Sequence, residues 1–166
     1  VFLFRRGRGM NQLQRSRHDA TRLRKQVCFI MSPIRAEGSR EREHSDDVRD
    51  LLIARALEML NKEGFNFDPP RRGDQVFEAG RIMDQVLDSI LEADLVIAVL
   101  TFANPNVYYE LGIAHSAGRP VLLLAEEGED VPFDLKHDRI GVRYQYKPRP
   151  FATDQVAREI ADNIKS

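Results

Sequence analysis

Two hydrophobic patterns alternate along the chain from residue 26 onward. Short, continuous apolar runs of strand length are separated by longer segments in which apolar residues recur every three or four positions, as on one face of a helix. Strands that alternate with helices usually pair in parallel, because each helix returns the chain to the starting edge of the sheet. The pattern predicts an α/β fold: a flavodoxin-like or Rossmann-like doubly wound sheet of about five mainly parallel strands.

Five segments have the length and composition of strands. The runs at 95–100 and 120–125 are apolar throughout, which is typical of central strands covered on both faces. Pro33 ends the first strand, and the polar segment 70–74 is expected to be a loop. The strands are expected at 26–32, 64–69, 95–100, 120–125 and 140–146.

Four segments have helical periodicity. The third has the clearest ends, because Asn104 is a good N-cap, Pro105 suits the first helical position, and Gly118 followed by Pro120 stops a helix. The helices are expected at 47–62, at 80–92, between Pro105 and Gly118, and at 154–165.

The composition is that of one globular domain. With 166 residues, 42% of them apolar and 31% charged, the chain can bury one core, and no run approaches the roughly 18 apolar residues of a membrane span. Cys28 is the single cysteine and cannot form an internal disulfide, so a reducing, cytoplasmic location is expected. The four histidines are scattered and no CxxC or HExxH spacing occurs, so we expect neither a metal nor a cofactor.

The first 25 residues differ from the rest in charge. They carry eight Lys or Arg and one Asp, a net charge of +7, and they lack sustained apolar periodicity. We interpret residues 1–25 as a basic N-terminal extension and residues 26–166 as the folded domain. A solvated tail or leading helix is expected for the extension, and a targeting peptide or a nucleic-acid-binding arm is the functional alternative.

Three loops at the carboxyl ends of the expected strands are candidates for a functional site, because ligands of doubly wound sheets bind there. They are 32–42 after the first strand, 69–75 with 78–81 after the second, and 101–106 after the third.

The first of these loops has residues suited to a phosphate. Gly38, Ser39, Arg40 and Arg42 offer backbone N–H groups, a hydroxyl and guanidinium charge. The spacing matches neither the GxxxxGK[ST] loop nor the GxGxxG turn. A flexible charged loop that solvates the start of a helix is the alternative.

Glu110 is the most unusual residue of the third helix. It lies in the second turn after Asn104, between Tyr109 and Leu111, and a carboxylate on so apolar a helix costs free energy to desolvate unless water, a partner or a ligand meets it. Gly112 in the helix interior costs up to about 1 kcal/mol relative to Ala, so we expect it to permit the close approach of a bulky group. Either Glu110 faces a sugar-binding cleft, or it pairs with an arginine while Gly112 packs on the sheet.

Longer stretches of the chain carry a resemblance to known proteins. They are FIMSPIRAEGSRER at 29–42, EAGRIMDQVLDSILEADLVIAVLTFANPNVYYELGIAHSAGRPVLL at 78–123, and VPFDLKHDRI at 131–140. Together they resemble the nucleoside 2-deoxyribosyltransferase-like superfamily, which includes the transferases and nucleotide N-glycosidases. ADLVIAVL followed by NPNVYYELG is the most specific part.

The resemblance implies a glycosyl-transfer mechanism. In the family, a glutamate in the YELG-like helix attacks the anomeric carbon of the sugar, which makes Glu110 the expected nucleophile. The carboxylate stabilises an oxocarbenium-like transition state, and water or a second base resolves the glycosyl-enzyme. In phosphate-accepting relatives the loop after the first strand cradles the nucleotide. Expected substrate-binding residues are Ser32, Arg35, Gly38, Ser39, Arg40, Gly80, Asn104 and Asn106, the two asparagines because they lie at a helix N-terminus.

One position departs from the family pattern. Well-studied members place a second acidic residue where this chain has Val86, with Asp84 and Asp88 two residues to either side. Two residues along a helix rotate a side chain by about 200°, so neither replaces that acid without a shift in register. Asp84 is the expected candidate for protonating the leaving group, and a solvent-facing charge is the alternative. Tyr108 or Tyr109 is a candidate for contacting the sugar or base, and packing is the alternative.

The leading interpretation is cleavage or transfer at the N-glycosidic bond of a nucleoside or, slightly favoured by the arginines, a nucleoside 5′-monophosphate. The alternatives are a catalytically weak nucleotide-binding sensor, suggested by Val86, and a TIR-like NAD glycohydrolase on the same kind of sheet. Because relatives commonly assemble as dimers or larger, we expect a homo-oligomer; nucleic acid is a partner only through the extension.

His115 is expected to be packed or at an interface, and Asp94 to be structural because it lies at the opposite end of its strand.

Overall fold

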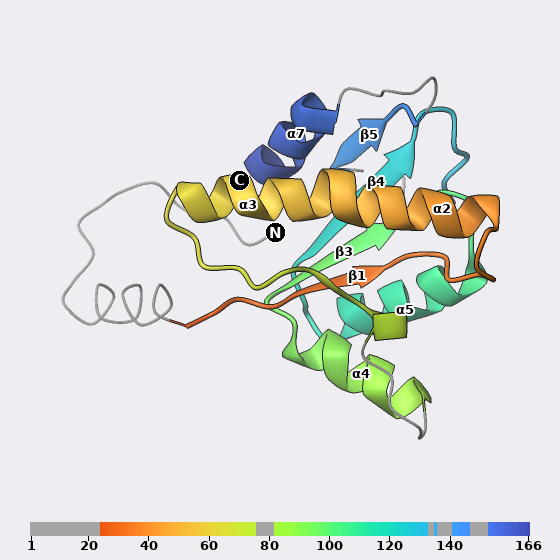
Figure 1. Ribbon diagram of the computed structural model, residues 1–166. Coiled ribbons are helices and arrows are strands. Elements are labelled where there is room, and N and C mark those ends of the chain that lie inside the picture. Colours follow the sequence, from red (N-terminus) through yellow and green to blue (C-terminus); the bar gives the residue numbers. More distant parts are fainter. Residues whose placement is uncertain (1–23, 76–81, 133–134, 136–140, 147–152) are drawn as a thin grey trace.

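A sheet of five parallel strands forms the centre of the molecule (Figure 1). The computed structural model describes residues 24–75, 82–132, 135, 141–146 and 153–166. In this part of the chain the strands pair in the order β2-β1-β3-β4-β5, and each neighbouring pair is parallel. The bounds are β1 Cys28–Met31, β2 Arg71–Arg72, β3 Leu95–Val99, β4 Val121–Glu126 and β5 Val142–Tyr144.

Helices cover both faces of the sheet (Figure 1). One face carries a long continuous helical segment made of α2, six residues of π-helix and α3, with α7 packed beside α3. The other face carries α4 and α5, which contact each other. This arrangement confirms the expected doubly wound α/β fold. The bounds are α2 Arg40–Asp47, the π-helix Val48–Ile53, α3 Ala54–Lys62, α4 Ile82–Glu92, α5 Pro105–Ser116 and α7 Thr153–Lys165.

The central strands are buried on both faces. In β3, Ile97 and Val99 pack with α3 and α7, whereas Val96 and Ala98 pack with α4 and α5, because successive side chains of a strand point to opposite faces. All residues of β1 and β3 are buried, which explains why their sequences are continuous apolar runs instead of alternating ones.

The second strand is not where the apolar pattern predicted it. It is formed by Arg71–Arg72, inside the segment 70–74 that was expected to be a loop, and the expected strand 64–69 contributes only an isolated bridge between Phe67 and Gln26. Arg72 is fully buried, and its guanidinium lies 2.6 Å from both Asp46 and Asp74. Pairing with two carboxylates compensates the charge of a buried arginine, and a local apolar pattern contains no sign of it.

The first helical segment also begins earlier than expected, at Arg40 instead of residue 47. Ser39 caps it by accepting a hydrogen bond from Arg42 N at 3.2 Å. The buried positions of α2 are His44 and Ser45, which are polar, so the apolar period starts only at Val48. The helical segment is therefore longer than its hydrophobic stripe.

The remaining expected elements lie close to their expected bounds. The start of α5 is confirmed in detail: Asn104 is the N-cap, its Oδ1 accepts a hydrogen bond from Asn106 N at 2.9 Å, and Pro105 occupies the first turn. Gly118 follows α5 with φ 64°, the left-handed conformation that ends helices. In the part of the chain that the structure describes, none of the helices combines the length and the hydropathy of a membrane span.

Candidate functional site

Two of the candidate loops lie side by side at the carboxyl edge of the sheet. β1 and β3 are neighbours in register, with Met31 paired to Ala98, so the loop that begins at Ser32 and the loop that begins after β3 leave the sheet next to each other. The first loop leads into α2 and the second into α5. Parallel neighbouring strands therefore bring Ser32, Arg40 and the start of α5 to one edge of the sheet.

Glu110 lies on α5, and its side chain is partly buried. Within the described residues, no hydrogen bond or ion pair reaches its carboxylate. Burial without a compensating partner raises the pKa of Glu110 to about 7. The alternative in which Glu110 pairs with an arginine is thus not observed in the described part of the chain, and the carboxylate is left to meet water or a ligand.

Two buried hydroxyl groups near this edge lack hydrogen-bond partners within the described residues. They are Ser32 Oγ, directly after β1, and the hydroxyl of Tyr108 on the first turns of α5. Burial, together with the charges of Glu129 and Asp130, raises the pKa of Tyr108. A buried hydroxyl without a partner carries a desolvation cost of about 1–3 kcal/mol, which a water molecule or a ligand can relieve.

The loop between β1 and α2 presents two arginines. Gly38 has φ 79°, which allows the turn before the cap Ser39, whose N–H binds the carbonyl of Ala36 at 3.1 Å. Arg35 and Arg40 are exposed, and within the described residues neither forms an ion pair with a carboxylate. The guanidinium of Arg40 lies 5.5 Å from the centre of the Phe102 ring. Both arginines are therefore available to an anion.

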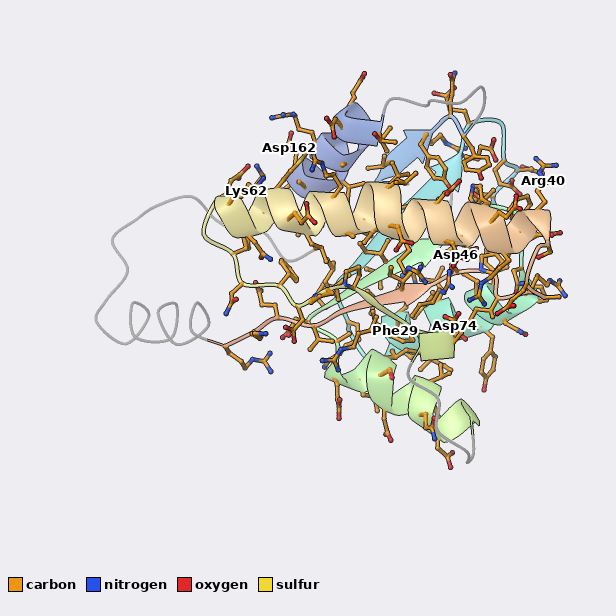
Figure 2. The ribbon with its side chains drawn as sticks, in the orientation of Figure 1. Phe29, Arg40, Asp46, Lys62, Asp74 and Asp162 are labelled. Carbon is orange, nitrogen blue, oxygen red and sulfur yellow. The ribbon has the colours of Figure 1, made fainter. Side chains whose placement is uncertain are left out.

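Arg42 is held differently. It pairs with Asp46 at 3.2 Å and with Asp74 at 2.7 Å, in the cluster that also surrounds the buried Arg72. Figure 2 labels Asp46 on the long helix and Asp74 just after β2. The sequence grouped Arg42 with Arg40 as a phosphate ligand, but the structure places Arg42 in a network of carboxylates.

The remaining expected binding residues are distributed unevenly. Asn104 is buried and its side-chain oxygen is occupied as the N-cap, whereas Asn106 is exposed beside it. Gly80 lies outside the described residues. Tyr109 is 60% exposed. Ser32 and the loop with Arg35, Gly38, Ser39 and Arg40 thus follow β1, and the helix α5 with its cap Asn104 and with Asn106, Tyr108 and Glu110 follows the neighbouring strand β3.

The helix α4 presents its acidic residues to solvent. Val86 is 5% exposed and packs in the core against residues of β1, β3 and α5, while Asp84 and Asp88 are exposed. No acid occupies the position at which the family pattern expects one. Asp84 stays a prediction as the leaving-group acid.

Three further expectations were tested by the structure. Asp94 accepts a hydrogen bond from Val27 N at 2.9 Å and pairs with Arg24, consistent with a structural role. His115 is exposed in the described chain, which excludes the packed alternative, and its place at an interface stays a prediction. Gly112 is also exposed, and a Cβ placed on it would meet no atom within 4 Å. The bulky neighbour expected beside Gly112 is therefore absent from the described residues.

A buried chain of polar side chains, which no sequence pattern indicated, lies at the same edge of the sheet. His44 Nε2 lies 3.1 Å from the hydroxyl of Tyr144, which lies 3.0 Å from Thr101 Oγ1. Burial lowers the pKa of His44 to about 4. His44 sits in the charged run EREHSDD, and Tyr144 belongs to the last strand, so no local pattern connects them.

The described chain also has grooves on its outer helices. Two shallow surface grooves lie along α3 and α7, lined mainly by charged residues such as Arg55, Glu58 and Lys62, and neither contains an expected site residue. Within the described residues, no group of three or more His, Cys, Asp or Glu side chains is arranged to hold a metal ion.

Comparison with known proteins supports the architecture. No protein-family model matches the chain, and neither does any curated protein. Among solved structures, the 2-deoxyribosyltransferase of Bacillus psychrosaccharolyticus matches with a TM-score of 0.52 and 16% identity, over 79% of this chain and 90% of that chain. This chain has a 2-deoxyribosyltransferase-like fold. At 16% identity the likeness concerns the fold, whereas activity depends on individual side chains.

Two further solved structures have lower TM-scores. The 2-deoxyribosyltransferase of Leishmania mexicana has a TM-score of 0.44 at 17% identity, over 76% of each chain. The CMP N-glycosidase of Clostridium botulinum has a TM-score of 0.47 at 18% identity, over 84% of this chain and 96% of that chain.

Proposed function

We propose that this protein cleaves or transfers at the N-glycosidic bond of a nucleoside or nucleoside 5′-monophosphate, with Glu110 as the nucleophile. The observation that carries the proposal is the carboxylate of Glu110, partly buried on α5 and without a charged partner among the described residues. Such a carboxylate is stabilised by positive charge that develops on a bound sugar, which is the requirement of an oxocarbenium-like transition state.

The chemistry needs two displacements at C1′ of the sugar. In the first, a carboxylate oxygen of Glu110 bonds to C1′ while the C1′–N bond breaks, and the base leaves with the bonding electrons and takes up a proton. In the second, water or another base attacks C1′ and releases Glu110. Two displacements on opposite faces return the original configuration at C1′, as in retaining glycosidases.

A 5′-monophosphate is favoured by the loop between β1 and α2. Arg35 and Arg40 lie exposed at the N-terminus of α2 without carboxylate partners among the described residues, and the first backbone N–H groups of a helix also attract anions. Two acidic residues in the first turn of α2, Glu41 and Glu43, reduce this attraction. The arginines are therefore the main source of phosphate affinity in this proposal.

Protonation of the leaving base is assigned to Asp84 as a prediction. The side chain is exposed on α4, and Asp88 is an exposed acid on the same helix. This pair permits a matched test. Asp84→Asn should lower the turnover of nucleosides that need a protonated leaving group, and Asp88→Asn should not; equal activity in the two variants would remove Asp84 from the mechanism.

The decisive experiment is incubation with nucleosides and nucleoside monophosphates, followed by chromatography for free base and, with a second base present, for the exchanged nucleoside. Glu110→Ala should abolish product formation, whereas Glu92→Ala, an exposed glutamate at the end of α4, should retain it. Mass spectrometry of enzyme quenched in acid should detect the added sugar on the peptide that contains Glu110. Undiminished activity in Glu110→Ala would exclude the assigned nucleophile.

A nucleotide-binding sensor is the second candidate, and burial of Val86 in the core favours it. A protein with a nucleophile but no matched acid can bind a nucleotide and turn it over slowly. Tight binding in calorimetry, with no base released over long incubation, would support the sensor and exclude the enzyme.

A further inference from the structure

The loop that connects β3 to α5 has a backbone conformation that needs support. Phe102 and Ala103 are consecutive non-glycine residues with positive φ, at 70° and 45°. Left-handed conformations of this kind cost on the order of 1–2 kcal/mol per residue and persist only where the surrounding structure imposes them. The next residue is Asn104, the N-cap of α5. The strained pair therefore determines where the helix that carries Glu110 begins.

The residue before the strained pair is fastened by its side chain. Thr101 is fully buried, and its Oγ1 accepts a hydrogen bond from Glu126 N at 3.0 Å while lying 3.0 Å from the hydroxyl of Tyr144. Tyr144 in turn lies 3.1 Å from Nε2 of the fully buried His44. The hydroxyl of Thr101 is thus connected to β4, to β5 and to α2.

His44 supports the same loop through its ring. The imidazole meets the ring of Phe102 edge-on, with 5.0 Å between centroids, and on its other sides it packs against Tyr144 and Tyr146. Arg40 contacts Phe102 from α2 as well. His44 therefore contacts Phe102 directly, and it is linked to Thr101 by the hydrogen bonds of Tyr144.

We infer that the chain of His44, Tyr144 and Thr101 is a positioning device that holds loop 101–104 in its strained form and so sets the placement of Glu110. The inference rests on the proposed function, because it assigns these three residues an effect on the reaction that acts through Glu110. They are positioning residues, because all three are buried and their hydrogen bonds run to one another and to Glu126 N.

The core packing of α5 separates this role from general stability. Val107, Leu111 and Ala114 are buried against the sheet and hold the helix on its face without help from the loop. Loss of the hydrogen bonds among His44, Tyr144 and Thr101 should therefore move only the first turns of α5. The rest of the helix should stay packed on the sheet. A misplacement of about 1 Å at a reacting group can lower a rate by about 100-fold.

The first test compares two replacements of one residue. Thr101→Val keeps the shape and removes the hydroxyl, which leaves Glu126 N and the Tyr144 hydroxyl without their shared partner, whereas Thr101→Ser keeps the hydroxyl. For the base-releasing reaction we expect kcat to fall about 10- to 100-fold in Thr101→Val with KM within about threefold. Thr101→Ser should retain most of the turnover.

The second test removes one hydroxyl from either of two tyrosines that pack against His44. Tyr144→Phe breaks the chain to Thr101, whereas Tyr146→Phe removes a hydroxyl that donates to Asp47 at 2.7 Å. Only Tyr144→Phe should reproduce the loss of kcat. An equal loss in both variants would indicate general destabilisation and would overturn the inference.

The third test needs no enzymatic activity. The carboxyl carbon of Glu110 can be titrated by NMR in protein labelled at glutamate, with Glu110→Gln used to assign the signal. Because burial is what raises the pKa of Glu110, loosening the loop in Thr101→Val or Tyr144→Phe should lower the pKa by about one unit. Wild-type protein without activity on any nucleoside or nucleoside 5′-monophosphate would reject the proposed function, while this titration would still decide the positioning role. The inference would be overturned if both the pKa of Glu110 and kcat stayed at their wild-type values in Thr101→Val and in Tyr144→Phe.

Discussion

Nε2 of His44 and the hydroxyl oxygen of Tyr144 lie 3.1 Å apart, although 100 positions separate the two residues in the chain. The contact joins α2 to β5 at the carboxyl edge of the sheet. It also removes an imidazole from water, which lowers the pKa of His44 to about 4. His44 and Glu110 are therefore two partly or fully buried groups whose pKa values are displaced in opposite directions, and their effects on stability oppose each other.

The pH dependence of folding should reveal this opposition. The unfolded chain ionises Glu110 near pH 4.5 and the folded chain near 7, so between these values stability falls as pH rises. The unfolded chain protonates His44 below about 6.5 and the folded chain only near 4, so there stability rises with pH. In Glu110→Gln the His44 contribution should remain alone, and the free energy of unfolding should increase by about 2 kcal/mol between pH 4.5 and 6.5.

Urea denaturation at several pH values measures this effect. The free energy of unfolding of the wild type should change less between the same two pH values, because the contributions of Glu110 and His44 cancel in part. Glu92→Gln, a change at an exposed position, should behave as wild type. Asp47, Arg40 and Glu126 are the charged groups near His44 and are unchanged in both variants. If the free energy of unfolding depended on pH in the same way in Glu110→Gln and in wild type, the raised pKa of Glu110 in the folded protein would be contradicted.

The pH dependence of the reaction should follow Glu110. A nucleophilic carboxylate must be ionised, and the pKa of Glu110 is about 7 in the folded protein. We expect kcat/KM for base release to rise with pH by about tenfold per unit below about 7, over the range in which ionisation of Glu110 limits the reaction. A profile that is flat from pH 5 to 9 would show that another group limits the reaction.

Arg72 and Arg71 provide a matched pair for stability. Arg72 is buried between Asp46 and Asp74, whereas Arg71 is exposed and pairs only loosely, at 3.6 Å, with Asp68. Burial alone would raise the pKa of Asp74, but hydrogen bonds and charge from Arg72 lower it. Arg72→Met should destabilise the fold by about 2–4 kcal/mol, because it leaves carboxylates without their buried partner. Arg71→Met should change stability by less than about 0.5 kcal/mol, as measured by chemical denaturation.

Arg40 should distinguish nucleotides from nucleosides. It is exposed at the start of α2, and within the described residues it has no carboxylate partner. Arg40→Ala should raise KM for a monophosphate about 10-fold and leave KM for the matching nucleoside within about twofold. Arg55→Ala, on α3 away from the carboxyl edge, should leave both KM values unchanged. Equal changes for the two substrates would argue against a phosphate site here.

Gly112 should tolerate a side chain. A Cβ at this exposed helical position meets no atom within 4 Å, so Gly112→Ala should raise the free energy of unfolding by about 0.5–1 kcal/mol through helix propensity. Thermal and chemical denaturation at low protein concentration measure the change. Destabilisation together with a smaller particle in sedimentation would instead show that a second copy of the chain contacts this part of α5.

Local sequence patterns predicted most of the fold. The continuous apolar runs of β1, β3 and β4 are required of strands buried on both faces, and the alternation with amphipathic helices leaves a parallel doubly wound sheet as the natural arrangement. The cap at Asn104 was predictable because it involves only residues within one turn. Glu110 could be selected as a candidate because an acid on an apolar helix conflicts with its surroundings, and that conflict is visible in the sequence.

Relationships between distant residues were decided only by tertiary structure. Arg71 and Arg72 form a strand because Asp46, 26 positions earlier than Arg72, is brought beside it, and no apolar period records such a pairing. Arg42 differs from Arg40 because the fold brings Asp46 and Asp74 to Arg42. The contacts of His44 with Tyr144 and of Thr101 with Glu126 exist only once the sheet has assembled. Periodicity reports which side of an element is buried, whereas the partners of a buried charge or hydroxyl depend on which elements the fold brings together.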